Sequence, residues 1–164
     1  TGPSALSYVG AAGLSTFSDF GIGTGCGNVV TAATDGAVGS LRFVLANCIA
    51  AGDTVKFDTS LSLLLITSDT ILLDRNVTIY ASSQDNIVIQ ASGTHSVLKV
   101  PALVTATIAN VELISGIGVD GRSIVNQGTL TLQDVEITDG GMMGSAVLNQ
   151  GMLLISGQTA IHSP

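Results

Sequence analysis

The feature that most constrains this fold is a phrase that the chain repeats. Residues 123–132 read SIVNQGTLTL and residues 146–155 read AVLNQGMLLI, so that Asn126 recurs as Asn149 after 23 positions. Self-similarity at a fixed period of this length is typical of a solenoid, in which each repeat is one structural unit stacked on the next. The repeat therefore predicts stacked turns of the chain around a common core.

The repeated unit consists of short strands. ANVELISG at 109–116 recurs as QDVEITDG at 133–140, with a period of 24. From Asp53 onward, apolar and polar residues alternate in short segments separated by Gly, Asn, Asp and Ser. Three short strands per unit are what one turn of a parallel β-helix requires, with about 4.8 Å between stacked strands. The chain beyond residue 53 is long enough for about five such turns. The expected strands are 54–57, 62–66, 70–73, 76–81, 86–90, 96–100, 105–108, 111–114, 123–126, 129–132, 135–138, 146–149 and 152–155.

Two other folds explain only part of this pattern. Leucine-rich repeats have a similar period, but their Leu/Asn consensus and helical return are missing here. A β-sandwich accounts for the alternation and not for equivalent residues 23 positions apart. Aromatic residues make up 4% and charged residues 10% of the chain, which favours strands with small turn residues. We therefore predict an all-β fold, a right-handed parallel β-helix.

One segment ahead of these strands has a helical period. Within GSLRFVLANCIAAGD at 39–53, Ser40 is placed to cap a helix and Gly52 to end it. An open end of a β-helix exposes apolar side chains and strand edges, so we expect this helix to cover the first turn. Its apolar stripe consists of Leu41, Val44, Leu45, Cys48 and Ile49.

The composition divides the chain into three parts. Residues 1–25 are Gly-, Ser- and Ala-rich with weak periodicity, which predicts a linker or the tail of a preceding module. Residues 26–52 are expected to form a cap of one strand and the helix, and residues 53–164 to form β-helix turns that are truncated at the C-terminus. We therefore expect the natural protein to continue with more turns, or two copies to meet end to end.

Cys26 and Cys48 stand 22 positions apart, and no His or further Cys lies near them at a spacing typical of metal ligands. A disulfide between them would stabilise the fold by about 3 kcal/mol and indicate an oxidising compartment. Two buried thiols are the alternative interpretation.

Charge and hydropathy exclude several classes of partner. The net charge is −7, and the five Lys and Arg residues are scattered, whereas nucleic acids and anionic membranes require a concentrated basic patch. The longest apolar run, LLLI at 63–66, is far shorter than the roughly 18 residues that span a bilayer. No phosphate-binding loop, nucleophile elbow or metal-ligand cluster occurs in the sequence, so no cofactor is expected.

A family resemblance adds to this interpretation. GSLRFVLANCIAAGDTVKFD at 39–58, NVTI at 76–79 and the two Asn-Gln-Gly turns resemble bacterial surface β-helices of the pectate-lyase-like superfamily. The resemblance covers about residues 27–160 and implies an extracellular or cell-surface β-helix with an N-terminal capping helix. Tyr80 stands where family members usually carry Gly, which predicts local bulges near residues 80–103.

The repeat places polar residues at equivalent positions. Asn126 and Asn149 are expected to stack as a ladder that satisfies turn backbone groups, which is a structural role. Glu112 and Glu136 should both point outward, with carboxylates about 5 Å apart, as in a retaining glycosidase.

Like charges at that distance also favour a bound cation or sugar, and Asp120 and Asp134 extend the same acidic strip. A solvated face is the simpler interpretation of this strip.

Three functional hypotheses follow. The first is a non-catalytic structural or adhesive module of a larger secreted or cell-surface protein, with a glycan or a protein as its surface ligand. The second is a carbohydrate-binding or polysaccharide-degrading β-helix, by kinship of fold alone. The third is ice or crystal binding, which requires regular outward threonine rows; only Thr107, Thr129 and Thr131 approach one.

Overall fold

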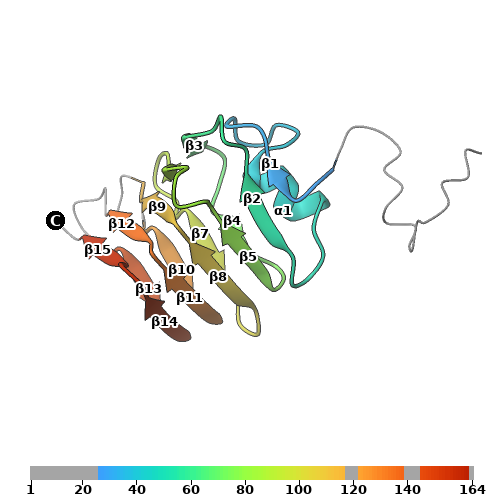
Figure 1. Ribbon diagram of the computed structural model, residues 1–164. Coiled ribbons are helices and arrows are strands. Elements are labelled where there is room, and N and C mark those ends of the chain that lie inside the picture. The colour runs from blue at the N-terminus through green and yellow to red at the C-terminus, as the bar shows by residue number, and fades with distance from the viewer. Residues whose placement is uncertain (1–25, 117–121, 139–144, 163–164) are drawn as a thin grey trace, which may run out of the picture.

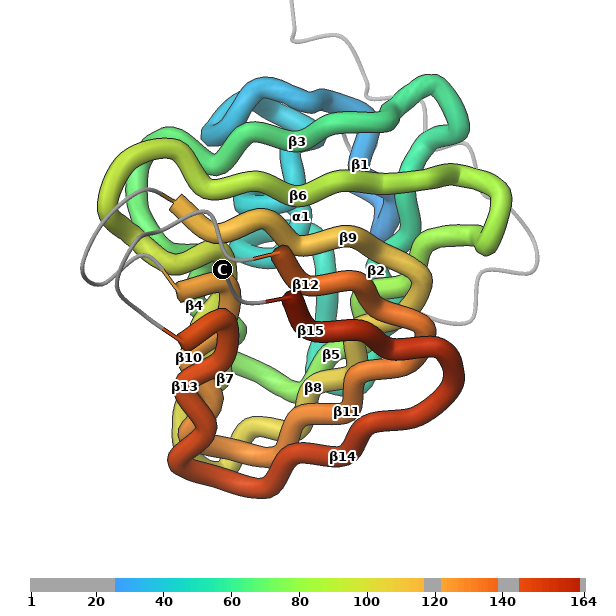
Figure 2. Tube along the Cα trace, turned by 90° about the vertical axis from the view of Figure 1, so that its left-hand side faces the viewer, coloured from blue at the N-terminus to red at the C-terminus, as the bar shows by residue number. Residues whose placement is uncertain are grey.

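The computed structural model describes residues 26–116, 122–138 and 145–162. Its strands form three parallel sheets, wound into a solenoid with one helix at one end (Figure 1). Successive turns stack around a common core (Figure 2). The all-β parallel β-helix is therefore confirmed, as is the estimate of about five turns. The expected linker at 1–25 lies outside the described residues.

A complete turn contributes one strand to each sheet, and because the first turns are incomplete, the described sheets have six, four and five strands. Sheet A contains β1 (Val29–Val30), β2 (Thr54–Phe57), β5 (Val77–Tyr80), β8 (Thr105–Ala109), β11 (Thr129–Gln133) and β14 (Met152–Ser156). Sheet B contains β4 (Ile71–Leu72), β7 (Leu98–Val100), β10 (Ile124–Asn126) and β13 (Val147–Asn149). Sheet C contains β3 (Leu63–Ile66), β6 (Ile87–Ala91), β9 (Val111–Ile114), β12 (Glu136–Thr138) and β15 (Ala160–His162).

All thirteen expected strands are present, with ends shifted by one or two residues at most. The sequence analysis did not predict β15.

The core is built from columns of inward side chains that stack from turn to turn. One column in sheet A is Val55, Ile79, Ile108, Leu132 and Ile155. The first four are fully buried. A stacked apolar column of this kind buries each side chain between its neighbours in the adjacent turns, and burial is worth about 1.5–3 kcal/mol for a large aliphatic side chain.

The helix α1 (Leu41–Asn47) lies at the start of the solenoid, against β1 and β2 (Figure 1). The Ser40 hydroxyl accepts a hydrogen bond from the Phe43 N–H at 3.2 Å, as expected of an N-cap. Leu41, Val44 and Leu45 are buried in the core. The helix therefore covers the apolar side chains of the first turns.

The expected end of the helix at Gly52 is wrong, because α1 ends before Cys48. Two hydrogen bonds of 2.7 Å hold the segment that follows: the Ala50 N–H donates to the Asp53 carboxylate within a turn, and the Gly52 N–H donates to the Asn76 carbonyl in the next turn of the solenoid. Gly52 has the expected positive φ of 94°, but it serves the turn into β2.

The irregularity expected near residues 80–103 lies in a turn and not in strand bulges. The pairs between β5 and β8, β6 and β9, and β7 and β10 are continuous. The extra residues are accommodated in the turn at 81–86, where the next turn of the solenoid has only Asn110. An insertion in a turn leaves the inward columns in register, which an insertion within a strand would not.

Candidate functional site

The two outward glutamates lie side by side on sheet C. Glu112 in β9 pairs with Glu136 in β12, and their neighbours Leu113 and Ile137 point into the core and are fully buried. The Glu136 carboxylate also lies 3.4 Å from the imidazole of His162. The expected acidic pair is thus formed by adjacent strands.

This pair borders a hollow of about 270 Å³, which we call the acidic hollow. Its polar lining consists of Ser82, Ser83, Asn86, Asn110, Glu112, Asp134 and Glu136. Asp120 lies outside the described residues. In the ranges that the structure describes, no three His, Cys, Asp or Glu side chains are placed to hold a metal ion.

Asp134 has a structural task in addition to lining the hollow. It adopts a positive φ of 52°, and its carboxylate accepts a hydrogen bond of 2.8 Å from the Gln158 N–H in the next turn. Left-handed residues recur at this corner of successive turns: Asn86, Asn110, Asp134 and Gly157. Asn, Asp and Gly tolerate this conformation best. The recurrence of Asn, Asp or Gly at the period of the repeat could have revealed this set of left-handed corner residues in the sequence.

The asparagine ladder forms between sheet B strands. The Asn126 amide donates to the Asn149 side-chain oxygen at 2.7 Å and to the Met152 carbonyl at 2.9 Å, and its own oxygen accepts from the Gly128 N–H at 3.1 Å. The Asn126 side chain is fully buried. One turn earlier the equivalent residue is Val100, so the ladder has two members among the described turns. Its hydrogen bonds satisfy turn backbone groups, as a structural role requires.

The glycine of the same phrase is required by close packing. A Cβ on Gly151 would lie 2.1 Å from the Gly128 carbonyl oxygen, and one on Gly128 would lie 2.3 Å from the Val104 oxygen. The Asn-Gln-Gly phrase therefore allows the turn backbones to stack closely between sheets B and A.

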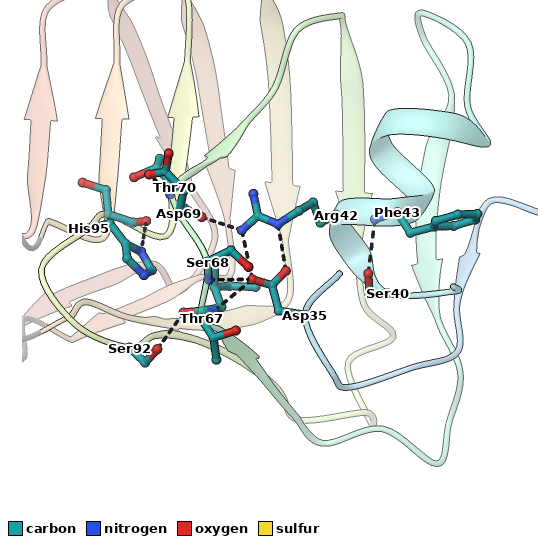
Figure 3. A network of polar contacts seen from close by, with 12 residues as sticks. Asp35, Ser40, Arg42, Phe43, Thr67, Ser68, Asp69, Thr70, Ser92 and His95 are labelled. Atoms are coloured by element: carbon teal, nitrogen blue, oxygen red, sulfur yellow. Dashed lines mark hydrogen bonds and ion pairs between the residues drawn. The ribbon is translucent and has the colours of Figure 1, made fainter. Parts of the chain in front are cut away.

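A second polar cluster, absent from the sequence-based predictions, lies beneath α1 (Figure 3). The Asp35 carboxylate accepts hydrogen bonds from the Arg42 guanidinium at 2.8 and 3.1 Å and from the Thr67 and Ser68 N–H groups at 2.9 and 3.0 Å. Arg42 also donates to the Asp69 carbonyl. We call this set the cap clamp, because it joins the segment before α1 to the turn that follows β3.

The electrostatics of the cap clamp favour an ionised Asp35. Its side chain has no exposed surface, while that of Arg42 is 27% exposed. Burial alone would raise the pKa of Asp35, but the hydrogen bonds from Arg42, Ser68 and Thr67 and the charge of Arg42 outweigh it. Together they hold the pKa well below its usual range.

A disulfide joins Cys26 to Cys48, with 5.1 Å between the two Cα atoms. It attaches the segment before β1 to the end of α1, so the alternative of two buried thiols is wrong. The expected disulfide is confirmed.

The threonine row is more complete than the sequence suggested. Four threonines form one outward column on sheet A: Thr54, Thr78, Thr107 and Thr131. The column ends at Leu154 in β14. The expectation that regular rows are missing is therefore wrong. Thr54 and Thr78 were overlooked because the longer turn at 81–86 places Thr107 29 positions after Thr78 and so breaks the period of 23 to 24 residues. The crystal-binding hypothesis stays a prediction, and inhibition of ice recrystallisation is the measurement that tests it.

Within the described ranges, no helix has the length and apolarity needed to cross a membrane. No family model, curated protein or solved structure matches the chain.

Proposed function

We propose that the chain is a non-catalytic structural and adhesive module of a larger extracellular protein. The observation that carries this proposal is the role of three polar side chains, which bind one turn of the solenoid to the next. Asp35, Asn126 and Asp134 each make hydrogen bonds to the backbone of a neighbouring turn, and so hold one part of the solenoid to the next. Such bonds rigidify a scaffold.

Location outside the cell is supported by the disulfide, because such bonds persist in oxidising compartments. The resemblance to bacterial surface β-helices supports the same location. A rigid solenoid suits display, since each turn adds length and exposes the same faces again.

The test is binding without turnover. The purified chain is applied to a glycan array and, separately, incubated with pectin and alginate while unsaturated products and reducing ends are measured. We expect retention on a surface ligand and no release of sugar. Release of sugar that is abolished by Glu136→Gln would overturn the proposal.

The second candidate, carbohydrate binding or cleavage, is favoured by the acidic hollow. Glu112 and Glu136 are paired across adjacent strands. The usual spacing of paired strands, about 4.8 Å, is close to the separation of about 5–5.5 Å between the carboxyl groups of retaining glycosidases. Binding of an oligosaccharide that is weakened by Glu112→Gln, but not by Asp69→Asn beneath α1, would support this candidate. Equal binding by both variants would place the sugar elsewhere.

A further inference from the structure

Asn76, at the corner between sheets B and A, uses its side chain differently from most asparagines of the chain. Five of the seven donate a hydrogen bond from the side-chain nitrogen: Asn28, Asn47, Asn110, Asn126 and Asn149. Asn76 is exposed and uses its oxygen, which accepts a hydrogen bond of 2.8 Å from the Thr105 N–H in the next turn. Its amide nitrogen donates no hydrogen bond within the described residues. That nitrogen therefore has no structural task.

The bond to Thr105 explains an oxygen at position 76 and not an amide. In the next two turns the equivalent N–H groups donate to backbone instead, from Thr129 to the Val104 carbonyl and from Met152 to the Gly128 carbonyl. An aspartate at position 76 would accept from Thr105 equally well. Neither the stacking of turns nor this hydrogen bond requires an amide group here.

The sequence around this nitrogen is that of a modification site. Asn76-Val77-Thr78 matches the acceptor sequence for N-linked glycosylation, Asn-x-Ser/Thr. No other asparagine of the chain has Ser or Thr two positions later. Val77 is buried, whereas Thr78 belongs to the outward threonine column of sheet A. Because side chains alternate across a strand, the two residues that define the acceptor lie on the outer face.

We propose that Asn76 carries an N-linked glycan. Its amide nitrogen attacks the anomeric carbon of an oligosaccharide that is carried on a lipid pyrophosphate. A carbon–nitrogen bond forms, the bond from that carbon to the pyrophosphate oxygen breaks, and the pyrophosphate leaves with the electron pair. The nitrogen gives up one of its two protons to solvent. The side-chain oxygen is unchanged, so the hydrogen bond from Thr105 persists in the product.

The attachment point lies away from the acidic hollow. Asn76 immediately precedes β5, whereas Ser82 and Ser83, which line the hollow, follow it. The four residues of β5, at about 3.3 Å each, separate these two corners by about 13 Å. A glycan is bulky and solubilising, so at Asn76 it adds a hydrated group at one end of β5 and leaves the acidic groups at the other end in place.

This inference rests on the extracellular location in the proposed function, because N-glycosylation acceptors are modified in secreted proteins. It does not depend on adhesion. Two measurements on one sample keep the location and the glycan apart: the state of the Cys26–Cys48 disulfide reports on an oxidising compartment, and the mass of the peptide that contains Asn76 reports on the glycan.

The test is to produce the whole chain behind a secretion signal in a eukaryotic host and to measure its mass. We expect a secreted chain that is heavier by one oligosaccharide. Peptide-N-glycosidase should remove it and convert Asn76 to aspartate, which mass spectrometry of the peptide locates. An unmodified Asn76 in a secreted chain with the disulfide formed would overturn the proposal and leave the extracellular location standing.

Three variants make the measurement specific. Thr78→Val keeps a β-branched side chain in the strand but removes the acceptor hydroxyl, so the glycan should be lost completely. Thr78→Ser keeps the acceptor sequence and should retain the glycan. The matched control is Thr107→Val, at the next position of the same outward column, which should also retain it. A glycan that persists in Thr78→Val would overturn the proposal, because the sugar would then be attached elsewhere.

Hydrogen exchange tests the division of labour between the two atoms of the Asn76 amide. The Thr105 N–H should exchange equally slowly in the glycosylated chain and in unmodified chain from a bacterial host, because its acceptor oxygen is untouched. Asn76→Ala removes that acceptor and should speed the exchange. Faster exchange in the glycosylated chain would contradict the geometry on which the proposal rests.

Discussion

The two ends of this solenoid are built from the same apolar columns and are finished in opposite ways. At the first end, α1, the Cys26–Cys48 disulfide and the cap clamp of Asp35 and Arg42 all converge on the opening turns. At the last end, in the described residues, β13 to β15 lie open with Ile155 half-exposed.

The difference shows that the stability of a turn depends on what covers it and not only on its own residues. In a solenoid each turn is stabilised by its neighbours, so a turn with one neighbour has about half of the stacking interface of an internal turn. The clamped end should therefore exchange its amide hydrogens slowly and the open end should fray first. The predictions below test this contrast.

The largest expected effect is at the cap clamp. Asp35→Ala removes the carboxylate that neutralises Arg42 and leaves the N–H groups of Thr67 and Ser68 without an acceptor. Breaking a buried ion pair from one side typically costs about 3–5 kcal/mol, so the free energy of unfolding should fall by about 4 kcal/mol. Urea denaturation measures it. Glu136→Ala, which removes an exposed carboxylate, should change it by no more than about 0.5 kcal/mol.

Acid should weaken the same end. Because the folded-state pKa of Asp35 lies below its unfolded value, its contribution is complete above the unfolded pKa and is lost as pH falls through the folded one. The wild-type free energy of unfolding should thus fall between about pH 5 and pH 2. Asp35→Asn lacks this titration, and its profile should be flatter. Parallel profiles for the two proteins would contradict the assignment.

Removal of the disulfide tests the covalent part of the cap. The double variant Cys26→Ser, Cys48→Ser releases a loop with a sequence separation of 22 and should lose about 3 kcal/mol. Thermal unfolding measures the loss. A reducing agent should bring the wild type to the stability of the variant and leave the variant unchanged.

A matched pair of substitutions compares the interior with the open end directly. Ile108 and Ile155 belong to the same inward column, two turns apart. Ile108→Ala creates a buried cavity and should cost about 3 kcal/mol, whereas Ile155→Ala should cost about 1 kcal/mol, because half of that side chain is already exposed. Equal losses would mean that the last turn is covered.

The smallest effect is expected at the end of the threonine column. Leu154→Thr continues the column by one member and exposes less apolar surface, so the stability of the monomer should change by no more than about 0.5 kcal/mol. Urea denaturation measures this change.

The sequence was sufficient for features that repeat at a nearly constant spacing. The Asn126 and Asn149 ladder, the strands around it and the Ser40 cap follow from period and local chemistry. Thr54 and Thr78 were not recognised as part of the threonine column, because the longer turn at 81–86 lies between Thr78 and the next member, Thr107.

The cap clamp could not be found in this way. Half of the partners of Asp35 are backbone N–H groups about thirty positions along the chain, at Thr67 and Ser68. Any residue except proline supplies a backbone N–H, so the identities of residues 67 and 68 do not indicate that they bind Asp35. Arg42, its charged partner, is visible in the sequence as part of the helix and not as part of an ion pair.

The position of α1 ahead of the β-helix turns in the chain gives folding a direction. Synthesis delivers the N-terminal part first, and each later turn then emerges beside a template that is already formed. Strand pairing between turns spans only 23 to 29 residues, so no strand has to wait for a distant partner. The helix that covers the first turn is therefore also the template on which the later turns can fold, one after another, in the order of translation.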